Sequence, residues 1–111
     1  MSDCQDPEFP DEECPPAPAI PGALSRDLAI VNRKGLHARA TAKLVQCVEK
    51  FDAEVFITRC GETVGGSSIM GILTLGAGLG STINIAARGA QAEAALDAIT
   101  ALVADKFGEE D

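Results

Sequence analysis

The prolines of this 111-residue chain divide it into two unequal parts. All six lie within the first 21 residues, and that stretch also carries six acidic residues and no lysine or arginine. A proline-rich segment of one charge sign with few large apolar side chains cannot offset its ordering entropy by burial. Residues 1–21 are therefore predicted to form a disordered tail, and the proline-free residues 22–111 to form one domain.

The composition excludes several classes of protein. The tail carries −6 of the net charge of −8, which leaves −2 for the domain, and the expected strands contain one aromatic side chain, Phe56. An RNA-recognition fold of the same element order needs strand aromatics and positive charge, so nucleic acid is not an expected partner. No stretch resembles a secretory signal or a membrane span, and a cytoplasmic location is expected. The four cysteines show no metal-ligand spacing, so free thiols and no metal or cofactor are expected.

Hydrophobic periodicity predicts seven elements in the order β-α-β-β-α-β-α. The residues expected in them are 28–31, 37–51, 54–59, 62–64, 69–73, 81–87 and 90–107, with Gly108 as the cap of the last helix. The helix over 37–51 has one apolar stripe, made by Ala40, Leu44, Cys47, Val48 and Phe51. Two long one-sided helices and four half-buried strands indicate an α+β fold, with a four-stranded antiparallel sheet covered on one face by helices.

The single histidine lies where a loop ends and the first helix begins. His37 follows Gly35-Leu36, and a helix N-terminus offers unpaired backbone N–H groups and partial positive charge. That position suits a phosphate and disfavours an imidazolium, so the neutral ring that can attack phosphorus is favoured. A lone histidine at a helix start is also commonly just a polar residue near a cap, and spacing alone leaves both interpretations open.

Four of the nine basic residues lie close to this histidine in the sequence: Arg33, Lys34, Arg39 and Lys43. A guanidinium in the first helical turn can pair with phosphate oxygens, which makes Arg39 a candidate for stabilising a phosphoryl group. The other three are candidates for docking an acidic partner surface.

The string Gly35-Leu36-His37-Ala38-Arg39-Ala40 resembles the active-site signature of the HPr family, the histidine-containing phosphocarriers of the phosphoenolpyruvate-dependent phosphotransferase system. Further segments fall in register with the family from about residue 26 to residue 107: Phe51-Asp52-Ala53-Glu54, the Gly61 turn, Ser68-Ile69-Met70, Leu73-Thr74-Leu75-Gly76 and Gly80.

The resemblance implies an open-faced β-sandwich in which His37 is phosphorylated at Nδ1 and Arg39 stabilises the phosphoryl group. It implies phosphoryl gain from Enzyme I and delivery to an EIIA-type acceptor. The chain is expected to be a monomer and a co-substrate that other proteins phosphorylate and dephosphorylate, not a self-contained enzyme, because no second general acid-base pair or metal constellation accompanies His37. A phosphoramidate suits such a relay because it keeps most of the transfer potential, and catalysis is then mostly positioning and charge stabilisation.

Two departures from the family pattern stand out. Ala40 replaces the usual proline after the arginine, and Ser67 stands where the family often has lysine. The Ser-Ile-Met-Gly stretch is closer to the nitrogen-related branch than to sugar-transport members, and the choice between sugar uptake and nitrogen regulation stays open.

Ser68 has two candidate roles. It is a good N-cap for the short helix, and by resemblance it matches the serine that HPr kinase/phosphorylase modifies in some lineages. Ile69 and Met70, if exposed, would form the apolar centre of a partner-binding patch. A regulatory binding module that acts through Ser68, Ile69 and Met70 without obligatory phosphotransfer is therefore the alternative function.

Overall fold

The computed structural model describes residues 17–109. The predicted tail lies outside the described residues up to residue 16, and residues 17–22 form coil and a turn. The elements follow as β1 (Leu24–Ala29), α1 (Ala38–Val48), β2 (Glu54–Arg59), β3 (Glu62–Gly65), α2 (Ile69–Thr74), β4 (Thr82–Arg88), α3 (Ala92–Ala104) and the 3₁₀ turn η3 (Lys106–Gly108). This is the predicted order, and no helix within the described part of the chain is long and apolar enough to cross a membrane.

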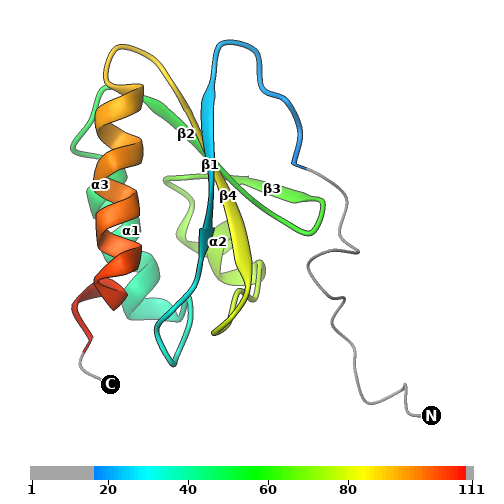
Figure 1. Cartoon of the computed structure of the whole chain (residues 1–111), viewed down its shortest axis with the longest axis vertical. Coiled ribbons are helices and arrows are strands. Elements are labelled where there is room, and N and C mark those ends of the chain that lie inside the picture. The colour runs from blue at the N-terminus through cyan, green and yellow to red at the C-terminus, as the bar shows by residue number, and fades with distance from the viewer. Residues whose placement is uncertain (1–16, 110–111) are drawn as a thin grey trace.

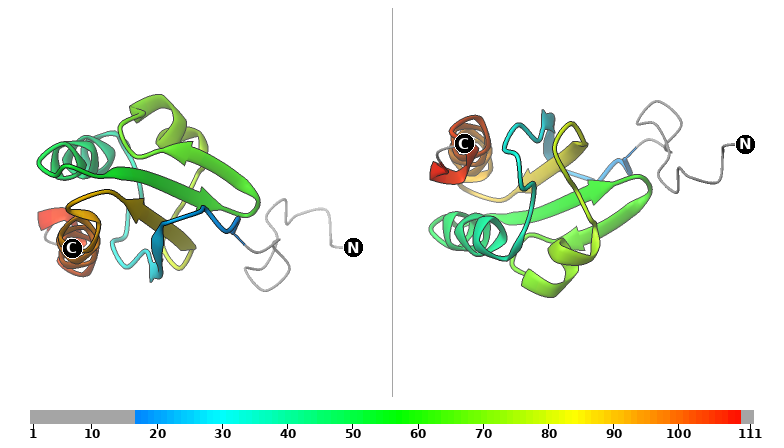
Figure 2. Two further views of the ribbon diagram at one scale, coloured as in Figure 1. Left: turned by 90° about the horizontal axis from the view of Figure 1, so that it is seen from above. Right: turned by 90° about the horizontal axis from the view of Figure 1, so that it is seen from below.

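The four strands form one antiparallel sheet in the order β1-β4-β2-β3. Inward positions of the two central strands are fully buried, among them Ile57 of β2 and Ile83 and Ile85 of β4. Helix α3 packs against β1 and β4, and α1 packs against α3 and α2. Figures 1 and 2 show the helical layer beside the sheet, which confirms the predicted open-faced β-sandwich.

The stripe predicted for the first helix is buried at its centre. Ala40, Leu44 and Val48 are at most 4% exposed, whereas Cys47 and Phe51 are partly buried at its edge. Thr41 and Val45 are also buried, because the helix contacts both α2 and α3 and needs a wider covered face than one stripe.

The first strand was misplaced by the sequence pattern, which predicts residues 28–31. The strand begins at Leu24 and ends at Ala29, because its ladder with β4 runs from Leu24 opposite Ala87 to Ala29 opposite Thr82. Ile30 is buried but leaves the ladder, and its N–H donates to the Ser81 carbonyl at 2.8 Å. Pairing with β4 therefore sets where β1 begins and ends, and the local apolar run does not.

The last helix is also shorter than the predicted 90–107. It ends at Ala104, and Lys106, Phe107 and Gly108 all have positive φ, so Gly108 does not cap a helix that reaches Phe107. The physical reason is the burial of Phe107, which is 1% exposed. Its backbone must turn out of the helix to place the ring in the core.

The β2–β3 connection is the predicted compact turn, with Cys60 and Gly61 both at positive φ. Cys47 is a free thiol, but Cys60 is disulfide-bonded, so the expectation of free thiols is wrong for Cys60. This cysteine is only partly buried, in the turn that follows β2. Cys4 and Cys14 lie outside the described residues.

Candidate functional site

The loop before α1 is tied down by its own side chains and by a second loop. The buried Asn32 donates from Nδ2 to the Gly35 carbonyl at 2.9 Å, and the Gly35 N–H donates to the Asn32 carbonyl at 3.2 Å. The Leu36 N–H donates to the Ala77 carbonyl at 2.8 Å. Gly35 has φ of +67°, a conformation that glycine adopts without steric cost. These contacts fix the point at which the helix starts.

His37 is the N-cap of α1. It has extended backbone, its carbonyl accepts the first helical hydrogen bond from the Thr41 N–H at 2.8 Å, and its Nδ1 accepts from the Arg39 N–H at 3.2 Å. An N-cap side chain that accepts from this amide satisfies one of the donors at the helix end. The helix start at His37 was predicted, and Nδ1 is hydrogen-bonded to one of the backbone amides that the prediction invoked for a phosphate.

The partners of the two ring nitrogens define the tautomer of His37. Nδ1 accepts a backbone N–H, so it carries a lone pair, and the proton of the neutral ring is on Nε2. Nε2 in turn donates to a carboxylate oxygen of Glu109. The His37 side chain is 28% exposed and that of Glu109 16% exposed, so the ring is reachable from solvent while its Nε2 edge is covered.

The four basic residues do not share one environment. Arg33 and Lys34 are exposed in the loop before Gly35, and Arg39 is exposed on the first turn of α1. Lys43 is partly buried, and its ammonium donates to the Phe107 carbonyl at 2.7 Å. Lys43 therefore holds the C-terminal segment against α1, while its contribution to partner docking stays a prediction.

Ser68 is the N-cap of α2, as predicted, and its hydroxyl accepts the Gly71 N–H at 3.1 Å. Ser68 is exposed, and so are the next two side chains, Ile69 at 43% and Met70 at 71%. A partner-binding patch was expected here if these two apolar side chains were exposed, and both are exposed.

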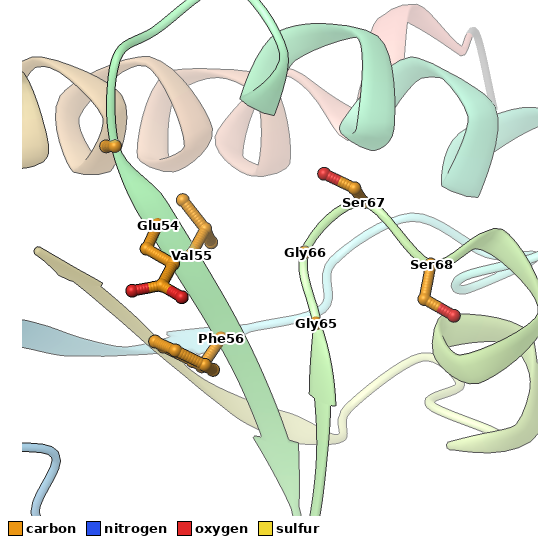
Figure 3. Close-up of a pocket in the computed structure, with 8 residues that line it drawn as sticks. Glu54, Val55, Phe56, Gly65, Gly66, Ser67 and Ser68 are labelled. Carbon is orange, nitrogen blue, oxygen red and sulfur yellow. The ribbon is translucent and has the colours of Figure 1, made fainter.

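A shallow pocket lies between β2 and the segment that joins β3 to α2, and it does not include His37. Figure 3 shows Ser67 and Ser68 on one side of it and Glu54 and Phe56 on the other. The residues that line it are Ala53, Glu54, Val55, Phe56, Gly65, Gly66, Ser67 and Ser68. The His37 ring lies outside this pocket, partly exposed at the start of α1.

Two residues of the site were not anticipated from the sequence. The sequence pattern gives no functional role to Asn32 or to Glu109, yet Asn32 Nδ2 donates to Glu109 Oε1 at 3.1 Å. An asparagine directly before an Arg-Lys-Gly loop was a weak signal for the first. No local pattern indicates the second, because its position depends on contacts with residues far away in the sequence. Among residues 17–109, no group of three or more histidine, cysteine or acidic side chains could hold a metal ion.

Most of the chain, including the His37 loop, matches a known protein family. Residues 24–105 match the family model described as the PTS HPr component phosphorylation site. The chain belongs to the HPr family. It is thus a member of the phosphocarrier proteins of the phosphotransferase system, as the resemblance of the Gly35–Ala40 string implied.

Individual relatives agree with this family assignment. The chain is 46% identical over 86 residues to phosphocarrier protein HPr of Cupriavidus necator, a match that covers 78% of this chain and 97% of the relative. It is 45% identical over 86 residues to phosphocarrier protein NPr of Shewanella violacea, covering 78% and 94%. Two such similar values do not separate the HPr and NPr branches.

Solved HPr structures have the same fold. A structure of HPr from Thermoanaerobacter tengcongensis superposes with a TM-score of 0.76 at 36% identity, covering 79% of this chain and 99% of the other. A phosphocarrier protein HPr from Bacillus anthracis gives a TM-score of 0.71 at 41% identity, covering 73% and 96%. The HPr fold thus spans the sheet, the three helices and the loop that carries His37.

Proposed function

We propose that this HPr-family chain accepts a phosphoryl group from phospho-Enzyme I on Nδ1 of His37 and passes it to an EIIA-type acceptor. The observation that carries the proposal is the environment of Nδ1. It has a lone pair, it accepts the Arg39 N–H, one of the backbone amides of the first turn of α1, and its ring is partly exposed. A phosphoryl group on this atom would meet those amides and the positive end of the helix.

The role of the protein in this step is positioning and charge stabilisation. In the unphosphorylated protein the Arg39 N–H donates to Nδ1. Once Nδ1 is bonded to phosphorus, this N–H is free to donate to a phosphoryl oxygen, and the exposed Arg39 guanidinium can add a charge-assisted hydrogen bond. Arg33 and Lys34 extend the positive surface around the ring and favour docking of acidic partners. The protein acts as a monomeric co-substrate in the cytoplasm.

The test is incubation with labelled phosphoenolpyruvate and Enzyme I. The wild type is expected to acquire one phosphate that is labile in acid and stable in alkali, and His37→Ala, with an unchanged circular dichroism spectrum, to acquire none. Absence of phosphate on the wild type, or equal labelling of a folded His37→Ala variant, would refute the proposal.

The exposed α2 surface supports a second, regulatory function. Ser68 offers its hydroxyl at the start of α2, beside the exposed Ile69 and Met70. HPr kinase/phosphorylase is the proposed modifying enzyme, with Ser67 as the competing acceptor. A phosphate there would oppose docking onto an acidic partner. Mass spectrometry after treatment with the kinase and ATP tests this: loss of the added phosphate in Ser68→Ala supports it, and its retention there assigns the site to another residue.

A further inference from the structure

The segment after α3 contacts the first turns of α1, through Lys43 and through the N-cap residue His37. Lys106, Phe107 and Gly108 have φ of 57°, 56° and 78°, and two of these residues are not glycine, so local preference does not produce this path. It is held by the buried ring of Phe107 and by the hydrogen bond from Lys43 to the Phe107 carbonyl. These two contacts fix the backbone immediately before Glu109.

Both carboxylate oxygens of Glu109 are used at the site. Oε2 accepts from Nε2 of His37, and Oε1 accepts from Nδ2 of Asn32 at 3.1 Å. Asn32 is fully buried and also holds the Gly35 carbonyl. Glu109 therefore joins the imidazole to the loop that precedes it, at a side-chain exposure of 16%, where a charge-assisted hydrogen bond is stronger than at a fully solvated surface.

We propose that Glu109 is a positioning residue for phosphoryl transfer to His37, an inference that rests on the proposed function. Its carboxylate keeps the ring proton on Nε2, which leaves the Nδ1 lone pair for phosphorus. As the Nδ1–P bond forms, the bond from phosphorus to the donor's nitrogen breaks and its electron pair leaves with the donor. The ring keeps its Nε2 proton and becomes positively charged, and Glu109 stabilises that charge as the acid of a catalytic triad stabilises its imidazolium.

The family match ends at residue 105 and so does not include Glu109. The two requirements of the proposal, a hydrogen-bond acceptor and a negative charge, can be separated by substitution. Glu109→Gln keeps an oxygen that accepts from Nε2 but removes the charge, and Glu109→Ala removes both. Glu93→Gln is the matched control, because it removes one exposed acidic charge at the opposite end of α3.

The experiment records two quantities on the full-length variants, with circular dichroism to show that each is folded. The ¹⁵N chemical shifts of the His37 ring report where the neutral ring carries its proton. The kcat/KM for phosphorylation by phospho-Enzyme I, split into kcat and KM, reports the transfer itself.

Glu109→Ala is expected to mix the two tautomers and to lower kcat/KM about tenfold, mainly in kcat, since one hydrogen bond to a charged group is worth about that factor. Glu109→Gln should keep the Nε2–H tautomer with a smaller loss, and Glu93→Gln should match the wild type. A folded Glu109→Ala variant with unchanged ring shifts and an unchanged kcat would overturn the inference while leaving His37 as the acceptor. A wild type that takes no phosphate would overturn the proposed function itself.

Discussion

One methyl group at Gly35 should disrupt the loop that carries His37. An added Cβ would lie 2.5 Å from the Ala77 carbonyl oxygen and 2.7 Å from Cα of Gly78. Both are backbone atoms, and the same carbonyl accepts the Leu36 N–H, so neither can yield without loosening the loop. The φ of +67° adds a second cost for any residue other than glycine.

The magnitude follows from these two effects. Left-handed backbone costs a non-glycine residue about 1–2 kcal/mol, and an extra methyl in a packed region costs about 1–3 kcal/mol. Gly35→Ala should therefore lose about 2–5 kcal/mol of unfolding free energy. In a domain of this size about 1 kcal/mol lowers Tm by roughly 4–8 °C, so a decrease of at least about 8 °C is expected.

Thermal unfolding followed by far-UV circular dichroism measures this, with Gly78→Ala as the matched control. A Cβ at Gly78 meets nothing within 4 Å, and its φ lies outside the left-handed region, so its Tm should stay within about 3 °C of the wild type. At a temperature where Gly35→Ala is still folded, its phosphorylation by Enzyme I should also be slower. If the two variants melt together, the close approach of Gly35 to Ala77 and Gly78 does not exist in solution.

Other substitutions test separate parts of the structure. Arg39→Ala should fold normally but accept phosphate from Enzyme I more slowly. An unchanged rate would show that the Arg39 guanidinium does not stabilise the phosphoryl group during transfer. Ser68→Ala should lower the free energy of unfolding by about 1 kcal/mol, measured in urea, because the helix loses its cap. Phe107→Ala should cost about 3–5 kcal/mol, and a loss below about 1 kcal/mol would show that this ring does not anchor the C-terminal segment. Burial raises the pKa of the Cys47 thiol. Because the buried thiol resists ionisation, the free energy of unfolding should decrease as the pH rises through that raised pKa, and Cys47→Ala should remove this contribution to the decrease at alkaline pH.

The features that the sequence predicted correctly are those set by neighbours in the chain. The start of α1 at His37, the Ser68 cap and the Cys60-Gly61 turn each depend on a few adjacent residues. The alternation that buries Ile83 and Ile85 likewise needs only a period of two.

The features that could not be predicted from the sequence are set by contacts between residues far apart in the chain. The bounds of β1 follow from its pairing with β4 and not from its own apolar run. The path of Lys106 and Phe107 opposes their local preference and depends on Lys43, more than sixty residues earlier. Glu109 reaches His37 only because of that path, so a candidate site built from local motifs could contain the histidine but not its carboxylate partner.

The most direct measurement of the central claim is the ³¹P and ¹⁵N NMR spectrum of the protein after incubation with phosphoenolpyruvate and Enzyme I. We expect a single phosphorus bonded to Nδ1 of His37, with the ring proton on Nε2. Phosphorus on Nε2, on another residue, or on no residue at all would contradict the account.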